Sequence, residues 1–205
     1  MRTFLVLLFG LAVLPSAVAA RASRSPALSM SVSSHKVLYS HRVTLSGKLT
    51  GTLASGRAVR IDAWTYGRLA PHALATVSTN VDGGWSFRVK PALQTTYQAH
   101  VGSTSSPRVT VGVAPAMSVS VLANGRIRAT VRGARAFDRR FVELQTRNAN
   151  DGWTTVGRRR LSTASIAVFS ATLPTATIRV AMSINQAGPV ISARRVTRSP
   201  TGRRC

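Results

Sequence analysis

Carboxylates, which could serve acid-base chemistry, number only five in this chain of 205 residues: Asp62, Asp82, Asp138, Glu143 and Asp151. A glycosidase needs two carboxyl groups that face each other across a cleft. Asp82, Asp138 and Asp151 stand in turn-forming sequences, where an aspartate ordinarily bonds the local backbone. Asp62 and Glu143 lie in corresponding apolar runs of the two halves, so we expect both to be solvent-facing partners for arginines. The sequence therefore offers no sign of a catalytic carboxylate pair.

Metal and nucleophile chemistry have no better support. The histidines all fall in the first half, and no two have a spacing that places them on one strand face; they are His35, His41, His72 and His100. Metal sites need three or four clustered donors. Serine and threonine are abundant, but the chain has no Gly-x-Ser-x-Gly elbow to expose a nucleophile. We therefore predict a protein that is not an enzyme and uses no cofactor or metal.

Aromatic residues suggest a second kind of site. Apolar side chains at alternate positions of residues 58–63 are expected to point inward, which places Trp64 on the outward face with Arg60 and leaves Tyr66 at the strand end. Exposed rings of this kind can stack on sugars. The alternative is that Trp64 covers a loop or an interdomain joint. Trp153 follows a turn, and there we expect its ring to cap the open end of a core.

Arginine gives the sharper functional hypothesis. In residues 126–132 arginines alternate with apolar residues, so three arginines should share one solvent face. A guanidinium binds phosphate or carboxylate through paired N–H donors. The alternative is a solvated face that keeps the sheet from pairing edge to edge. The candidate basic face comprises Arg126, Arg128, Arg132, Arg139, Arg140, Arg158, Arg159 and Arg160.

Charge points to the class of partner. Lysine and arginine number 28 against 5 acidic residues, and the net charge of +23 is spread along the chain. Such an excess favours contact with anionic wall polymers, polysaccharides or lipid headgroups. We exclude nucleic acid, because export separates the chain from cytoplasmic partners and no nucleic-acid-binding motif is present.

The N-terminus predicts export. Arg2 precedes an apolar stretch at residues 4–14 and small residues at 17–20, which together are typical of a signal peptide over residues 1–20. The apolar stretch is shorter than the about 20 residues of a membrane span. We expect a secreted protein that can associate with the cell envelope. The alternative is that the segment remains as an uncleaved anchor. We expect residues 21–25 to be a linker.

Short runs with β-type patterns fill both halves, and no window has helical spacing with caps. In the first half the runs are residues 28–33, 42–47, 58–63, 73–79, 85–90, 95–101 and 108–113. In the second half they are residues 117–122, 126–132, 140–146, 153–159, 165–173, 177–184 and 190–196. Turn formers such as Gly56, Gly83, Gly125 and Gly152 separate them.

This rhythm predicts an all-β protein of two tandem antiparallel β-sandwiches with about seven strands each. We place them at residues 26–113 and 114–197, with a joint at Ala114-Pro115 and a flexible basic tail at 198–205. The inward faces of the first should include Val43, Leu45, Val59, Ile61, Trp85, Phe87 and Val89. The only cysteine, Cys205, cannot staple a sandwich; it could form an intermolecular disulfide in a homodimer or be an accidental terminal residue.

Residues 79–89, followed by Pro91 and residues 95–97 and preceded by residues 44–47, resemble bacterial immunoglobulin-like domains of exported proteins. In such a turn Asp82 would bond backbone amides while the glycines accept positive φ. The resemblance covers most of the first half. It implies an immunoglobulin-like sandwich.

In the second half, residues 126–131, 142–145 and 151–156 are similar to strands of the same family. The Asp-Gly-Gly-Trp turn has no direct counterpart before Phe169. Chains of this tandem type resemble secreted proteins of high-GC Gram-positive bacteria, and the resemblance implies roles as spacers, adhesins or sugar-binding appendages.

Together these features predict a structural or adhesive module of the cell envelope that binds anionic surface polymers through an arginine-rich sheet face. One alternative is a carbohydrate-binding accessory module that uses Trp64 and Tyr66. Another is a membrane-active cationic protein.

Overall fold

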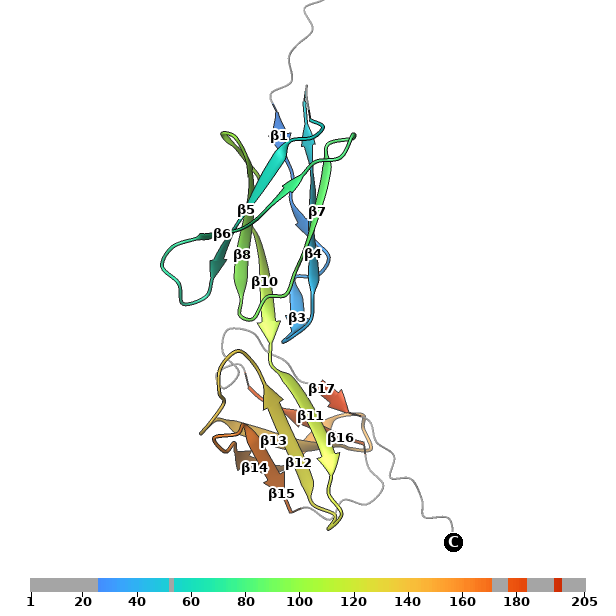
Figure 1. Cartoon of the computed structure of the whole chain (residues 1–205). Helices are drawn as coiled ribbons and strands as arrows, with labels where there is room; N and C mark the ends of the chain where they lie inside the picture. The colour runs from blue at the N-terminus through green and yellow to red at the C-terminus, as the bar shows by residue number, and fades with distance from the viewer. Residues whose placement is uncertain (1–25, 52–53, 171–176, 184–193, 197–205) are drawn as a thin grey trace, which may run out of the picture.

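The computed structural model describes residues 26–51, 54–170, 177–183 and 194–196, the last of these by their backbone alone. Strands are the regular elements of this part of the chain, which contains no helix. Two groups of strands follow one another along the chain and meet where one strand leads into the next (Figure 1). The prediction of an all-β sandwich fold is confirmed.

The first group forms two sheets. Its strands are β1 (Ala27–Leu28), β2 (Ser31–Val32), β3 (Lys36–Leu38), β4 (Val43–Thr50), β5 (Ala58–Thr65), β6 (His72–Ser78), β7 (Gly84–Val89), β8 (Thr95–Val101), β9 (Thr104–Ser105) and β10 (Val109–Ala114). In one sheet β1, β2 and β7 pair with β4, and the other has the order β3-β10-β8-β5-β6 with β9 beside β8. The pairs are antiparallel except for β3 with β10.

The second group also forms two sheets. Its strands are β11 (Ala116–Val121), β12 (Ile127–Arg132), β13 (Phe141–Arg147), β14 (Trp153–Arg160), β15 (Ile166–Phe169), β16 (Ile178–Ala181) and β17 (Arg194–Val196). One sheet has the order β11-β12-β15 and the other β14-β13-β16-β17. Parts of the predicted runs at 165–173, 177–184 and 190–196 lie outside the described residues.

Each group encloses its own apolar core, because alternate residues of its strands point between the two sheets. In the first core Val43, Leu45, Val59, Ile61 and Trp85 are buried as predicted. Phe87 and Val89 are partly buried and pack against that core. The short strands β3 and β9 are additions that alternation did not reveal.

Tyr97 brings a phenol into the first core, where it is 1% exposed. Burial raises the pKa of Tyr97 above its usual value of 10.0, because the low-dielectric core disfavours a phenolate. A hydrogen bond with Thr95 has a smaller, opposite effect on this pKa.

Glycine makes room for Trp85 in the first core. Gly47 pairs with Trp85 across β4 and β7. A Cβ atom at position 47 would collide with the backbone oxygen of Ser29 and stand 2.8 Å from Cε2 of Trp85. A residue without a side chain is therefore required where β4 passes under the indole ring.

The turn before Trp85 is closed by Asn80, and the expected role of Asp82 is wrong. The Oδ1 atom of Asn80 accepts hydrogen bonds from the amides of Asp82 at 3.0 Å and Gly84 at 2.7 Å. An asparagine four residues before the last glycine of the turn can reach both amides at once. Gly83 adopts a φ of 77°, as its place in the turn requires.

The same turn recurs in the second half before Trp153. There the Oδ1 atom of Asn148 accepts from the amides of Asn150 at 3.1 Å and Gly152 at 2.8 Å. Asp151 takes the left-handed position with a φ of 57°. The counterpart of the first turn thus stands before β14. The sequence comparison sought that counterpart before Phe169.

A β-bulge also recurs. The register between β5 and β6 shifts between Ile61 and Asp62, and that between β13 and β14 shifts between Leu144 and Gln145. Both bulges lie in the corresponding hairpin of their group. A bulge inserts one unpaired residue and so reverses which side chains face inward beyond it.

Candidate functional site

The outer face of the sheet formed by β13, β14 and β16 gathers arginines and aromatic rings. Val142 and Leu144 of β13 point into the core, so Phe141, Glu143 and Gln145 point outward. Across the ladder Arg160 is opposite Phe141, and Arg158 is opposite Glu143. These outward positions define what we call the β14 face: Phe141, Glu143, Gln145, Trp153, Thr155, Arg158, Arg160 and Arg179.

Two arginines of the β14 face share one aromatic ring. The guanidinium carbon of Arg158 lies 4.3 Å from the ring centroid of Phe141, and that of Arg160 lies 5.2 Å from the same centroid. Both arginines are exposed. A guanidinium that lies over a ring uses its face for that contact, and the N–H donors at its edge can still contact an oxyanion.

A third arginine belongs to a polar network on the same face. The guanidinium of Arg179 lies 4.2 Å from the ring centroid of Trp153, and its Nε donates to Oε1 of Gln145 at 2.7 Å. Gln145 in turn donates from Nε2 to Oε2 of Glu143 at 3.2 Å. The only acid of the β14 face is therefore held by an amide and, at 3.3 Å, by the hydroxyl of Thr155.

The predicted role of Trp153 as a cap of the core is wrong. Its ring is partly exposed on the β14 face, beneath Arg179. The bulge explains this placement: without it Trp153 would fall on the inward side of β14, and with it Trp153 pairs with Arg147 on the outward side. The sequence analysis did not identify Trp153 or Arg179 as site residues. For Arg179 the only indication in the sequence was the strand-like alternation of residues 177–184.

The arginines of the predicted basic face are divided between the two sheets. Arg128 and Arg132 are exposed on β12, in the sheet opposite β14, and Arg126 is exposed just before that strand, as their alternation predicts. The exposed Arg139 and Arg140 lie in the segment that leads into β13. Arg159 is exposed on β14 at the alternate position between the two arginines that contact Phe141.

In the first group the outer face of β5 and β8 holds an ion-pair cluster. Asp62 was expected to face solvent, but it is 8% exposed. It is covered because the Nη2 of Arg60 donates to its Oδ2 at 3.0 Å while Nε2 of His100 approaches the same oxygen at 3.3 Å. The expected arginine partner of Asp62 is thus present, and the predicted exposure is wrong. Glu143, expected to be exposed as well, is half-buried.

Ser105, His100 and Asp62 stand in a row that has the composition of a hydrolytic triad. The Oγ of Ser105 lies 2.9 Å from Nδ1 of His100. The contact between His100 Nε2 and Asp62 is within ion-pair distance, but it lacks hydrogen-bond geometry. Triads activate serine through Nε2 and orient the ring through Nδ1, the reverse of this arrangement. The row is therefore a polar cross-link between strands.

The two aromatic candidates lie in different surroundings. Trp64 is half-buried, and the guanidinium of Arg108 lies 4.5 Å from its ring centroid. Arg108 also donates from Nε to Oε1 of Gln98 at 3.3 Å, so this cation is anchored over the ring. A sugar could reach only the indole surface that Arg108 leaves open. Tyr66 is 54% exposed.

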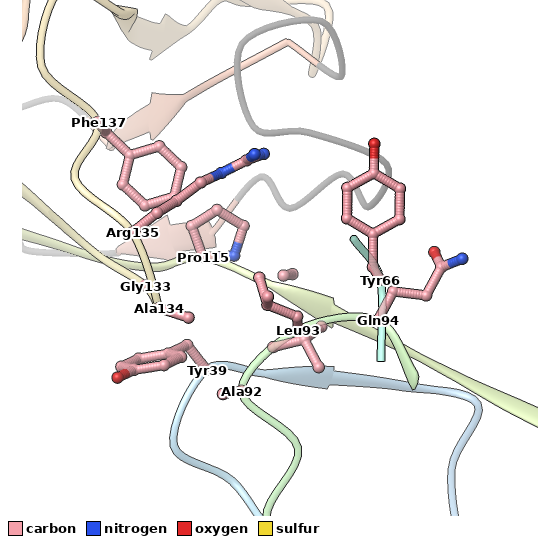
Figure 2. A pocket seen from close by; sticks show the side chains of 12 residues that line it. Tyr39, Tyr66, Ala92, Leu93, Gln94, Pro115, Gly133, Ala134, Arg135 and Phe137 are labelled. Atoms are coloured by element: carbon pink, nitrogen blue, oxygen red, sulfur yellow. The ribbon is translucent and has the colours of Figure 1, made fainter. Parts of the chain in front are cut away.

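Tyr66 also lines a pocket between the two strand groups. Figure 2 shows Leu93 and Pro115 at its centre, with Tyr39 and Tyr66 on the side of the first group. Arg135 and Phe137 reach it from the second group. The cavity measures about 30 Å³, which holds water but no sugar ring. This pocket is a packed joint with no room for an organic ligand.

Other features bear on the remaining predictions. Within the described ranges, His, Cys, Asp and Glu side chains form no cluster of three or more that could hold a metal ion. Cys205 lies outside the described residues. The same part of the chain includes no helix with the length and apolar character needed to cross a membrane.

Comparison with known proteins adds no assignment. No protein-family model matches the chain, and a search of curated proteins finds no match either.

Proposed function

We propose that the protein is an exported, non-enzymatic module of the cell envelope, built of two tandem immunoglobulin-like domains, that binds anionic surface polymers. Two separate apolar cores, each between two sheets, support the tandem arrangement, as does the bulge that both groups share. The net charge of +23 favours polyanions as partners.

The observation that carries this proposal is the state of Arg158 and Arg160. Both are exposed and lie against Phe141. Among the residues that the structure describes, no carboxylate lies within 4.0 Å of either guanidinium. Their charge is thus available to an external anion, whereas Arg60 and Arg147 already pair with Asp62 and Asp151.

The test is binding of the purified mature chain to a soluble polyanion at several salt concentrations. We expect the Kd to rise steeply between 50 and 200 mM salt, about tenfold or more when several charges are in contact, because bound counterions must be displaced. Binding that ignores salt would contradict the proposal. So would an affinity for a neutral polysaccharide equal to that for the polyanion.

A second candidate, contact with a membrane surface, is favoured by the loop between β5 and β6. Leu69 in this loop is fully exposed beside the exposed Arg68, and the loop stands away from the sheets (Figure 1). Insertion of one leucine side chain stabilises binding by about 1.5–3 kcal/mol. We expect Leu69→Ser to weaken binding to anionic lipid vesicles, with Val81→Ser as the control, because Val81 is exposed in a different loop. Equal binding by both variants and the original chain would remove this candidate.

A further inference from the structure

The described part of the chain presents two sets of exposed arginines on opposite sheets of the second group, and they differ in how they are held. Arg158 and Arg160 of β14 share the ring of Phe141. Arg128 and Arg132 of β12 flank Thr130, and their neighbours on β11 are Ser120 and Ala116. Their Cα atoms are separated by about 13 Å along the strand.

We propose that Arg158 and Arg160 bind two oxyanions of one linear polyanion, and that the arginines of β12 contribute only general charge. This inference rests on the proposed function, and it assigns the site and the spacing of the ligand's charges. Residues two apart on a strand have Cα atoms about 7 Å apart. Two phosphate or carboxylate groups of one polymer chain, adjacent or not, that have a similar spacing would meet one guanidinium each.

Electrostatics favours a ligand with two charges over one. The two guanidinium carbons can be no farther apart than the sum of their distances to the Phe141 centroid. Two like charges at this separation repel each other. A single anion relieves the charge of one arginine, whereas two linked anions neutralise both without a second loss of translational freedom.

Stacking also prepares the site for binding. An arginine side chain loses conformational entropy when it is fixed, and contact with Phe141 imposes part of that loss before the ligand arrives. The edge of each guanidinium matches the two oxygens of a carboxylate or a phosphodiester. No corresponding aromatic contact holds Arg128 or Arg132 within the described residues.

Glu143 limits the site on one side. It lies opposite Arg158 on β13, but its Oε2 atom accepts hydrogen bonds from Gln145 and Thr155. A carboxylate held in this position repels an anion that approaches from β16. The polymer should therefore follow the exposed edge strand β14.

The experiment compares two double variants that remove the same charge from the mature chain. Arg158→Gln with Arg160→Gln changes the proposed site, and Arg128→Gln with Arg132→Gln is the matched control. The probes are inorganic polyphosphate, polygalacturonate and inorganic phosphate. We expect the β14 pair of substitutions to raise the Kd for at least one polymer about tenfold or more, because charge-assisted hydrogen bonds are lost. The β12 pair should raise it no more than about threefold.

Two further readouts separate a specific site from net charge. The β14 double variant should reduce the slope of log Kd against log salt concentration by about two, one for each lost contact. Phe141→Leu keeps the net charge, yet it should weaken binding several-fold because the guanidiniums lose their support. Circular dichroism melts establish that each variant is folded.

The outcomes are distinguishable. If the original chain binds neither polymer, the proposed function fails. If it binds but both double variants weaken it equally, the proposed function stands and the β14 site is overturned. Inorganic phosphate that competes as strongly per charge as either polymer would also overturn the site. Tighter binding of polyphosphate or of polygalacturonate identifies the chemical source of the oxyanions. Either result supports the site if only the β14 double variant weakens that binding.

Discussion

Trp85 and Trp153 follow the same asparagine turn and end in opposite environments. In both turns an asparagine Oδ1 accepts two backbone amides, and a glycine precedes the tryptophan. Trp85 is 5% exposed within the first core, whereas Trp153 lies partly exposed beneath Arg179. The local turn does not decide which side of the sheet the ring occupies.

Strand parity makes the difference. On β7 the register with β4 is continuous, so Trp85 shares the inward side with Phe87 and Val89. On β14 the register with β13 shifts: Leu144 pairs with Gly157, whereas Gln145 pairs with Thr155, so one residue of β14 is left unpaired. This changes the parity and turns Trp153 outward. One additional residue in a strand thus converts a core position into part of a candidate binding face.

Replacing each tryptophan should change stability the most, and it tests the comparison directly. We expect Trp85→Ala to lower the free energy of unfolding by about 3–5 kcal/mol, because it empties the centre of the first core. Trp153→Ala should cost no more than about 1 kcal/mol, mainly the contact with Arg179. Urea unfolding followed by circular dichroism measures both, and equal losses would show that Trp153 also supports a core.

Next in size is the glycine on which the burial of Trp85 depends. Gly47→Ala should destabilise the first group by about 1–3 kcal/mol or more, because the added methyl meets rigid backbone at Ser29. Gly157→Ala is the matched change in the second group, where the nearest atom is Cδ1 of Phe169 at 3.2 Å. That ring can shift, so we expect a smaller loss in calorimetry. The reverse order would contradict this account of Gly47.

The asparagine turns should be equivalent. Asn80→Ala and Asn148→Ala each remove two hydrogen bonds to backbone amides, so each should cost about 1–2 kcal/mol. Both variants are measured by the same urea unfolding. A loss confined to Asn80 would mean that the second turn is held by other contacts.

The smallest expected effect is on the free energy of unfolding at alkaline pH. It concerns the first group, because the tyrosines all precede residue 98. Because burial raises the pKa of Tyr97 in the folded state, the folded chain keeps a proton that the unfolded chain releases above pH 10. The free energy of unfolding should therefore fall as the pH rises above 10. Tyr97→Phe should lessen that fall in unfolding measured between pH 8 and 11, and an unchanged pH profile would contradict the burial effect.

Sequence patterns predicted the strands well because alternation records which residues face a core. Val43, Leu45, Val59 and Ile61 show this alternation, and they are buried. The turn at residues 148–152 could also have been found, since Asn148 and Trp153 repeat the spacing of Asn80 and Trp85.

The β14 face could not be predicted in the same way. Its composition depends on the bulge after Leu144, and no residue type marks that position. The burial of Asp62 was missed because it depends on His100, which is distant in the sequence and adjacent only across the β5 and β8 ladder. Such pairings need the strand order, which alternation does not contain.

The parallel pairing of β3 with β10 has a mechanical consequence. Pro115 alone separates β10 from β11, so a pull on the second group is transmitted directly along β10. The backbone bonds from Tyr39 to Ala114 at 2.7 Å and from Gly112 to His35 at 2.8 Å lie across that line of force. They would be sheared together and would share the load.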